Sequence, residues 1–334
     1  MTELRSVRGF EDALRPPVDV RRARITPAVL KPSSGGARDA ILARVERVAR
    51  RVPEVMVKVT GRTRDGAHLR AHFQYIGRNG EVPLETADGR RLSDPEKVRT
   101  LAQDWAEEAK MAGGRRDAPL THAIILSMPA GTDANSLHDA ARAFAAEVFA
   151  DRFAYVFALH DEGRHPHVHL TVQSLGRDGE RLNPRKADLQ VWRERFAHAL
   201  RARGIEAEAT PRRTRGVTRK AERMADRKLR ERFESGQGDT PGRLNDAARE
   251  ASNPREKASA WDVAIRRRQT RIRRLLVAET LRLKASPSAA DRVLGSGLEA
   301  FIRNLPAVAT RRQILERSLN SDRAPRESSR SRGR

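Results

Sequence analysis

Residues 160–172, HDEGRHPHVHLTV, place four of the chain's nine histidines within ten positions and run into alternating apolar residues. Successive side chains of a strand point to opposite faces, so His165, His167 and His169 would share one face and the apolar residues the other. A row of imidazoles backed by an apolar face predicts a divalent metal site. Imidazole nitrogen suits transition metals better than Mg. The alternative is a solvated, histidine-rich edge strand.

The flanking sequence alternates between helical and strand patterns. Apolar residues at helical spacing predict helices over 39–51, 67–77, 94–111, 133–149 and 187–203. Short apolar runs predict strands over 55–60, 123–127 and 153–159, with a turn over 61–66. Helix caps are expected at Ser93 or Asp94 and at Thr132 or Asp133. This order predicts an α+β sandwich with a central, mainly antiparallel sheet flanked by helices.

Composition divides the chain into three parts. Residues 1–50 form a proline- and glycine-containing arm, flexible over 1–38, followed by a helix; residues 51–216 form the sandwich domain. Residues 217–334 form a basic extension, helical over 219–233 and 260–283 and disordered at its Ser/Arg-rich end.

Charge is concentrated at the C-terminal end. Residues 212–334 carry 32 Lys+Arg against 15 Asp+Glu, a net +17 of the chain's +23. Arginine stays charged and binds phosphate through two parallel hydrogen bonds, so this asymmetry predicts a nucleic-acid partner. The alternative is a disordered tail that is basic only for solubility.

Composition also excludes some functions. Without cysteine, thiolate catalysis and thiolate metal ligation are ruled out. Neither a run of about 18 apolar residues nor a signal-peptide pattern is evident, so we expect a cytoplasmic protein without membrane insertion.

A divalent metal site in a basic protein suggests phosphate chemistry, which needs a nucleophile. Because the chain has no cysteine, tyrosine is the next residue type to consider. Tyr155 lies inside an apolar run, which predicts a core aromatic. Tyr75 lies near the end of a predicted helix, ahead of a glycine-containing exit. There its hydroxyl can point outward, and the nearby Arg78 would stabilise a phenolate or bind a phosphate. Taken alone, this pattern also fits a tyrosine that packs between helices.

Several motifs occur together in one order. They are QYIGRNG at 74–80, LAQDW at 101–105, ILSMPAGT at 125–132, the histidine motif at 160–169, and GI at 204–205 ahead of RRTRG at 212–216. In this combination the chain resembles the relaxases, or mobilisation nucleases, of the MOBP group, which includes T-DNA border endonucleases. The group belongs to the His-hydrophobe-His endonuclease superfamily. The resemblance covers about residues 55–216 and implies a relaxase-type sandwich.

The resemblance implies a reaction and its residues. Tyr75 would attack a scissile DNA phosphate, leaving a 5′-phosphotyrosyl link and a free 3′-hydroxyl. The metal ligands would be His160, His167 and His169, with Mn or Mg as the ion. Glu162 would orient the site, with Asp161 as its competitor for that role.

Further residues are expected to contact DNA or phosphate. They are Arg78, Ser127, His165, Arg212 and Arg213. The family pattern tolerates other residues at the position of His165, so strand parity overcounts the ligands by one. Ser127 has a purely structural alternative, as a serine that leads into the following helix.

The expected enzyme is a metal-dependent, site-specific DNA nickase and strand transferase that initiates conjugative mobilisation. Its expected partners are single-stranded origin-of-transfer DNA, relaxosome accessory proteins and a type IV coupling protein. Two alternatives stay open at this point: a non-catalytic DNA-binding accessory protein on a relaxase fold, and a rolling-circle replication initiator. Initiators place the histidine motif before the tyrosine, whereas Tyr75 precedes His167 here.

Overall fold

The computed structural model of the chain contains two compact units. The sheet unit comprises Arg15–Thr210, and the helical unit comprises Met1–Leu14 together with Pro211–Arg334. The structure describes residues 6–16, 18–25, 36–113, 118–162, 165–218, 224–242, 245, 249 and 260–308. The first five residues of the helix predicted over 219–233, and the Ser/Arg-rich end predicted to be disordered, lie outside these ranges.

The sheet unit is built on six antiparallel strands. They are β1 (Met56–Thr63), β2 (Leu84–Thr86), β3 (Arg91–Leu92), β4 (Thr121–Ser127), β5 (Tyr155–His160) and β6 (His167–Gln173). Their order across the sheet is β1-β4-β6-β5-β2-β3. The histidine-bearing β6 is therefore a central strand, and its interpretation as a solvated edge strand is wrong. The predicted antiparallel sandwich is confirmed.

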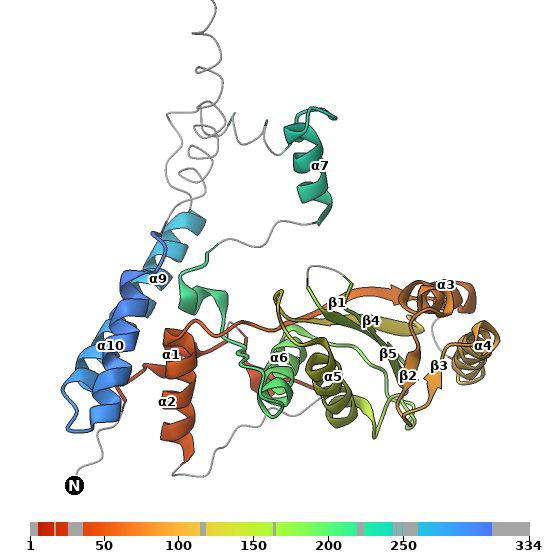
Figure 1. The fold of residues 1–334 in the computed structure, drawn as a ribbon, viewed down its shortest axis with the longest axis horizontal. Coiled ribbons are helices and arrows are strands. Elements are labelled where there is room, and N and C mark those ends of the chain that lie inside the picture. The colour runs from red at the N-terminus through yellow and green to blue at the C-terminus, as the bar shows by residue number, and fades with distance from the viewer. Residues whose placement is uncertain are drawn as a thin grey trace, which may run out of the picture. The chain divides into compact units, whose positions relative to one another are not determined.

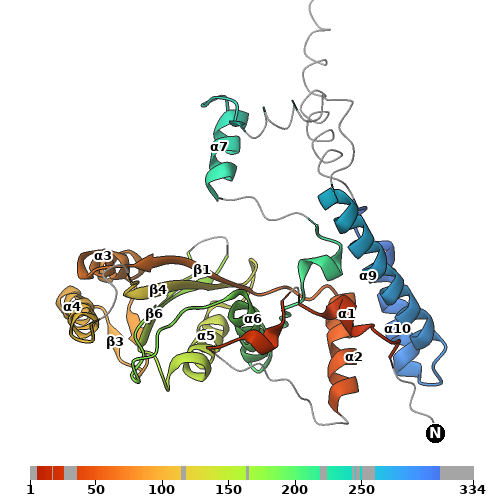
Figure 2. The same ribbon diagram turned by 180° about the vertical axis from the view of Figure 1, so that it is seen from behind.

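Helices cover both faces of this sheet, with α5 (Ala134–Phe149) and α6 (Lys186–Arg201) on one face and α3 (Gly66–Ile76) and α4 (Pro95–Met111) on the other. The unit also contains α2 (Gly36–Ala49) and the short helical turns η1 (Val20–Arg22) and η2 (Arg78–Gly80). Figures 1 and 2 show α5 beside α6 and α3 beside α4. Asp94 and Asp133 cap α4 and α5, which decides between the predicted cap pairs.

Strand alternation divides the interior into two cores. Val168, Leu170 and Val172 of β6 are buried in a core shared with α5 and α6. The opposite face of the sheet packs against α3 and α4, whose Phe73 and Trp105 are buried there. The histidines of β6 alternate with its apolar residues, so they belong to the α3–α4 face.

The predicted turn over residues 61–66 is wrong in its first half. Strand β1 continues to Thr63 and remains paired with β4, with a β-bulge between Val59 and Gly61. The bulge absorbs one extra residue, and glycine is well tolerated at such a position. The Oγ1 atoms of Thr63 and Thr121 are hydrogen-bonded at 2.7 Å, which holds the strand end in register.

The predicted flexible arm is partly anchored. In the sheet unit, the carboxylate of Asp188 accepts hydrogen bonds from the backbone N–H groups of Arg24 and Ile25, at 2.6 and 2.8 Å. In the helical unit, Phe10 is fully buried and the N–H of Val7 donates to Glu279 Oε2 at 2.9 Å. The sequence before residue 26 carries no periodicity that would have indicated these contacts.

The helical unit is organised around two long helices. Its elements are α1 (Glu11–Leu14), η3 (Arg212–Arg215), α7 (Met224–Glu234), α9 (Ala260–Lys284) and α10 (Ala289–Arg303). Helices α9 and α10 lie side by side in both views (Figures 1 and 2). They approach closely at Gly295, where a Cβ atom would lie 2.9 Å from Lys284 Cγ and 3.0 Å from Leu283 Cβ. Only glycine fits this crossing without displacing its neighbours. None of the described helices has the length and apolar character needed to cross a membrane.

Candidate functional site

Three histidines meet where β5 ends and β6 begins. His160 is the last residue of β5 and lies directly opposite His167, the first residue of β6. His169 follows two positions later on the same face of β6. One ring nitrogen from each histidine can be chosen so that all three lie within 4.8 Å of one another. The strand pairing thus brings three imidazole rings to one point, where they could hold a metal ion.

Hydrogen bonds orient two of these rings. His160 Nε2 lies 2.7 Å from the carbonyl oxygen of Ile76, and His167 Nδ1 lies 3.0 Å from the carbonyl oxygen of His165. A carbonyl can only accept, so each of these nitrogens carries the proton. The other ring nitrogen of each histidine then presents a lone pair, as a metal ligand must.

The third ring is buried and neutral. His169 is 7% exposed, and its Nε2 atom has no hydrogen-bond partner among the described residues. Burial, and then the nearby imidazoles of His160 and His167, lower the pKa of His169 to about 3. Burial also lowers the pKa of His160. A buried ring nitrogen without a partner beside two oriented imidazoles fits a bound metal ion, and three nitrogen donors suit a transition metal.

Tyr75 lies against this cluster. Its ring meets the ring of His169 edge-on, with centroids 5.9 Å apart and planes at 86°. The side chain is 67% exposed, whereas Tyr155 is 2% exposed and packed in the core. The alternative of Tyr75 as a tyrosine packed between helices is therefore wrong, and Tyr155 is the core aromatic predicted.

The end of α3 is tied to the histidines through its backbone. Ile76 is the last residue of α3, so its carbonyl has no partner within the helix and accepts from His160 instead. After Gly77, Arg78 and Asn79 have positive φ angles of 47° and 56°. Gly80 follows at 104°, where a Cβ would lie 2.8 Å from the carbonyl oxygen of Ser93. Tyr75 is thus followed by a strained, tightly packed turn.

A charged pair borders the site. The Arg78 guanidinium donates to the carboxylate of Glu162, which follows β5. Their side chains are 35% and 61% exposed, so the pair is accessible and contributes little to stability. It places one cation and one carboxylate beside the tyrosine and the histidines.

The site lies within a region shared with known proteins. A relaxase family model described as MobA/VirD2-like, nuclease domain, matches residues 76–205, a span that contains the three histidines and starts one residue after Tyr75. The chain carries a MobA/VirD2-like relaxase nuclease domain.

Individual relatives agree with this assignment. The chain is 29% identical over 202 residues to the T-DNA border endonuclease VirD2 of Rhizobium radiobacter, covering 54% of this chain and 47% of that protein. It is 28% identical over 221 residues to VirD2 of Agrobacterium fabrum, covering 60% and 48%. The chain thus spans about half the length of these relatives.

A solved structure is also similar, at a greater distance. It is described as "Molecular Basis of Vancomycin Resistance Transfer in Staphylococcus aureus", with 14% identity and a TM-score of 0.32, and covers 48% of this chain and 99% of that one.

Other residues predicted to act in the relaxase domain have different positions. The Ser127 hydroxyl is buried and donates to the carbonyl oxygens of Met128 and Pro166, both at 3.3 Å. His165 precedes β6 and is exposed, so strand parity does not align it with the other histidines. Asp161 is exposed as well.

The two predicted arginines at the basic turn lie outside the sheet unit. Arg212 and Arg213 belong to η3 of the helical unit. The structure therefore does not assign them to the histidine site of the relaxase domain.

His72 is a further residue of the relaxase site region, for which the sequence analysis predicted no role. It lies one turn before Tyr75 on α3, and its Nε2 is hydrogen-bonded to Thr171 Oγ1 of β6 at 2.9 Å. Burial lowers the pKa of His72 to about 4, so the ring is neutral near pH 7. This bond fastens α3 to the strand that carries His169. In the sequence, the i, i+3 spacing between His72 and Tyr75 could have indicated that the two side chains lie near each other on the helix.

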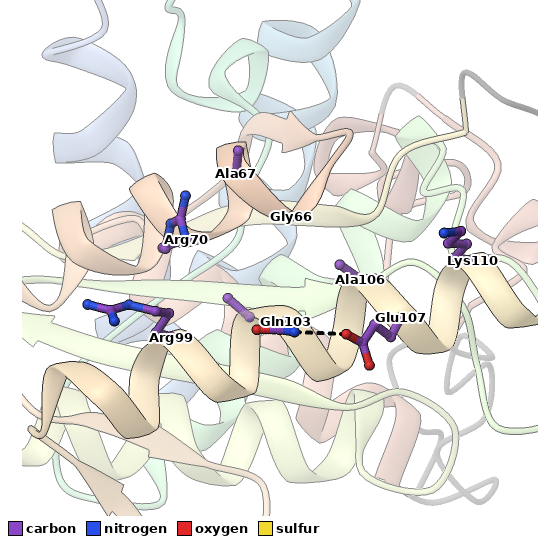
Figure 3. A pocket seen from close by; sticks show the side chains of 9 residues that line it. Gly66, Ala67, Arg70, Arg99, Gln103, Ala106, Glu107 and Lys110 are labelled. Carbon is purple, nitrogen blue, oxygen red and sulfur yellow. Dashed lines mark hydrogen bonds between the residues drawn. The ribbon is translucent and has the colours of Figure 1, made fainter.

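A cavity of about 300 Å³ lies apart from the site, between α3 and α4. Figure 3 shows its lining, in which Arg70, Arg99 and Lys110 surround a floor of small residues and Gln103 donates to Glu107. Neither Tyr75 nor any of the three clustered histidines lines it. Its mixed charges, with Arg99 also paired to Glu96 at 2.9 Å, indicate no specific ligand.

Proposed function

We propose that the relaxase domain nicks one strand of DNA at a transfer origin through attack by Tyr75. The observation that carries this proposal is the exposed Tyr75 ring lying edge-on to the buried His169 of the histidine cluster. A nucleophile beside a metal-binding cluster is the arrangement that phosphoryl transfer needs, because positioning and charge neutralisation supply most of the catalysis.

The proposed reaction exchanges one bond to phosphorus for another. Tyr75 loses its phenolic proton to solvent, and its oxygen forms a bond to the phosphorus of the scissile phosphodiester. The bond from phosphorus to the 3′-oxygen breaks, and that oxygen takes up a proton. The products are a 5′-phosphotyrosyl link and a free 3′-hydroxyl. The link conserves the energy of the broken bond, so the cut strand can be rejoined after transfer.

Each site residue has a task in this proposal. His160, His167 and His169 hold the metal ion. When bound, the ion polarises a phosphoryl oxygen and neutralises charge that develops on it. Arg78 contacts the phosphate, and Glu162 holds the guanidinium in place until DNA arrives.

The wider role is part of the same proposal. The DNA would be single-stranded at the transfer origin, the ion Mn or Mg, and the reaction the first step of conjugative mobilisation in the cytoplasm. Accessory proteins of the relaxosome and a type IV coupling protein would assist. The relatives named T-DNA border endonuclease support the DNA substrate.

The test is covalent capture of DNA. The protein is incubated with labelled single-stranded oligonucleotides from the neighbouring transfer-origin region plus Mn or Mg, and the adduct is mapped by mass spectrometry. Wild type should form an adduct on Tyr75, and Tyr75→Phe should form none while still binding DNA. Tyr155→Phe, which removes a buried hydroxyl, is the matched control and should retain the adduct. An adduct in Tyr75→Phe would disprove the assignment.

A further inference from the structure

Helix α9 of the helical unit carries opposite charges on opposite sides. Its two acidic residues, Asp262 and Glu279, are 9% and 0% exposed. Its exposed charges are all positive and come from Arg266, Arg267, Arg268, Arg271, Arg274 and Lys284. The outward face of α9 therefore has no carboxylate of its own to neutralise these cations.

The buried acids already have internal partners. Glu279 accepts the backbone N–H of Val7 at 2.9 Å and pairs with Arg282 at 2.7 Å, and that arginine side chain is only 9% exposed. On the outer side, Asp12 contacts Arg271 at 2.7 Å, yet the Arg271 side chain remains 70% exposed. The outward face thus keeps a strong net positive charge.

The arginines form a row rather than a scatter. Arg267, Arg271 and Arg274 are spaced i, i+4, i+7, which places them on one face of the helix. At 1.5 Å per residue the row extends about 10 Å along the axis. Thr270 lies on the same side and is exposed. A linear row of cations matches the regular negative charge of a DNA backbone.

A second basic element packs beside this helix within the unit. Gln269 Nε2 donates to the carbonyl oxygen of Arg213 at 3.0 Å, which holds η3 against α9. Burial, and then the charge of Arg268, lower the pKa of Arg213. Like charges gathered in this way repel one another, and a bound polyanion relieves that repulsion.

The described side chains favour duplex over single-stranded DNA. Proteins that bind single strands without sequence preference stack bases on exposed aromatic rings. Among the side chains described in the helical unit, Phe10 and Phe301 are buried and Phe233 is half-buried. Exposed arginines that contact phosphates position the protein on the duplex and do not read its bases.

We propose that the outward face of α9, centred on Arg267, Arg271 and Arg274, binds the phosphate backbone of duplex DNA without reading its sequence. The proposal rests on DNA being the substrate of the relaxase domain. It assigns the duplex that flanks the transfer origin to the helical unit.

The test compares two pairs of substitutions in the full chain. Arg267→Gln with Arg274→Gln removes two charges from the row. Arg227→Gln with Arg230→Gln removes two charges from α7, where each arginine is paired with a glutamate four residues later. Binding is measured by fluorescence anisotropy at several salt concentrations, using a duplex of about 20 base pairs without a transfer origin, long enough to span the row of cations. Circular dichroism checks that the helices persist.

The α9 pair should weaken duplex binding and reduce the slope of log K against log salt by about 2, close to 0.9 for each lost phosphate contact. The α7 pair should change neither, and Thr270→Lys, which adds a cation to the row, should tighten binding. Equal losses in both pairs would overturn the proposal, as would a loss confined to single-stranded DNA.

The same variants separate this proposal from the nicking reaction. Formation of the Tyr75 adduct on a short single-stranded oligonucleotide should be unchanged by the α9 pair. If the wild-type protein forms no adduct but the α9 pair still binds duplex DNA more weakly than wild type, the duplex surface stands and the nicking proposal fails. An adduct without any α9 effect on duplex binding supports nicking and overturns the duplex surface.

Discussion

The two units differ in how their basic groups would meet the phosphate partner that we propose. In the sheet unit, His160 and His169 are buried, their pKa values are lowered, and two ligand rings are oriented by single hydrogen bonds. In the helical unit, the outward arginines of α9, among them Arg267, Arg271 and Arg274, are exposed, and a guanidinium stays charged at every working pH. All nine histidines of the chain lie within residues 68–198 and none in the helical unit. In the proposed function, chemistry would depend on the positions of a few ring nitrogens, whereas attachment to DNA would depend on summed charge.

Substitution of a ligand should have the largest effect on this contrast. His169→Ala removes the buried nitrogen that lacks a partner, and adduct formation should fall by more than about 100-fold, because even partners outside the ligand shell are worth about 10–100-fold. His165→Ala, an exposed control four positions earlier, should stay within about twofold of wild type. Rates come from gels of covalent adduct, and an equal loss in His165→Ala would show that four histidines act together.

The second largest effect should be a difference between the two units in their response to added or removed metal. A ligand at about 100 times its Kd stabilises the folded state by about 2.7 kcal/mol. Hydrogen exchange measured by mass spectrometry should therefore slow in β5, β6 and the end of α3 when Mn is added. Exchange in α9 and α10 should not respond, and His169→Ala should lose the effect. Equal slowing in both units would contradict a metal site confined to the sheet unit.

Acid should destabilise the sheet unit more than the helical unit. Burial, and then the charge of Arg62, lower the pKa of His122 from 6.5 to about 4, and its Nδ1 is hydrogen-bonded to Ser174 Oγ at 2.9 Å. Between these two values the unfolded chain binds a proton that the folded chain excludes, so stability is present above pH 6.5 and is lost as pH falls toward 4. His122 alone accounts for at most about 3 kcal/mol. Urea unfolding of wild type and His122→Asn from about pH 7 to about pH 4.5 measures this, and parallel pH profiles would refute it.

The helix crossing in the helical unit should give the smallest effect. Gly295→Ala places a Cβ against Leu283 and Lys284 and should destabilise the α9–α10 pair by about 1–3 kcal/mol. Ser296→Ala, at the neighbouring exposed position, is the control. Faster hydrogen exchange in α10 with unchanged adduct formation on short oligonucleotides is the expected result. A matching loss of adduct would mean that nicking depends on this unit.

Much of the sheet unit could be predicted because its signals are local. Alternation in residues 168–172 predicted a strand with one apolar face, and β6 has that pattern. Caps and apolar spacing predicted the helices within a few residues. The turn over 61–66 was predicted wrongly because a glycine in a strand pattern indicates a break, although here it accompanies a bulge.

Features that depend on distant contacts could not be predicted. The bond between His160 and the Ile76 carbonyl joins residues 84 positions apart through a backbone atom that every residue carries. His165 fitted the strand alternation, but β6 begins only at His167, after Pro166. The roles of Tyr75, Glu162 and the three ligands, and the boundaries at residues 50 and 216, remain predictions.

The contact between Val7 and Glu279 has a consequence for the time at which each unit forms during synthesis. The two residues are 272 positions apart, so Val7 is synthesised long before the partner that it contacts. Residues 15–210 are complete long before that moment. Domains generally fold as units while the chain emerges. The sheet unit with its histidines is therefore able to fold first, and the duplex-binding helix gains its full support last.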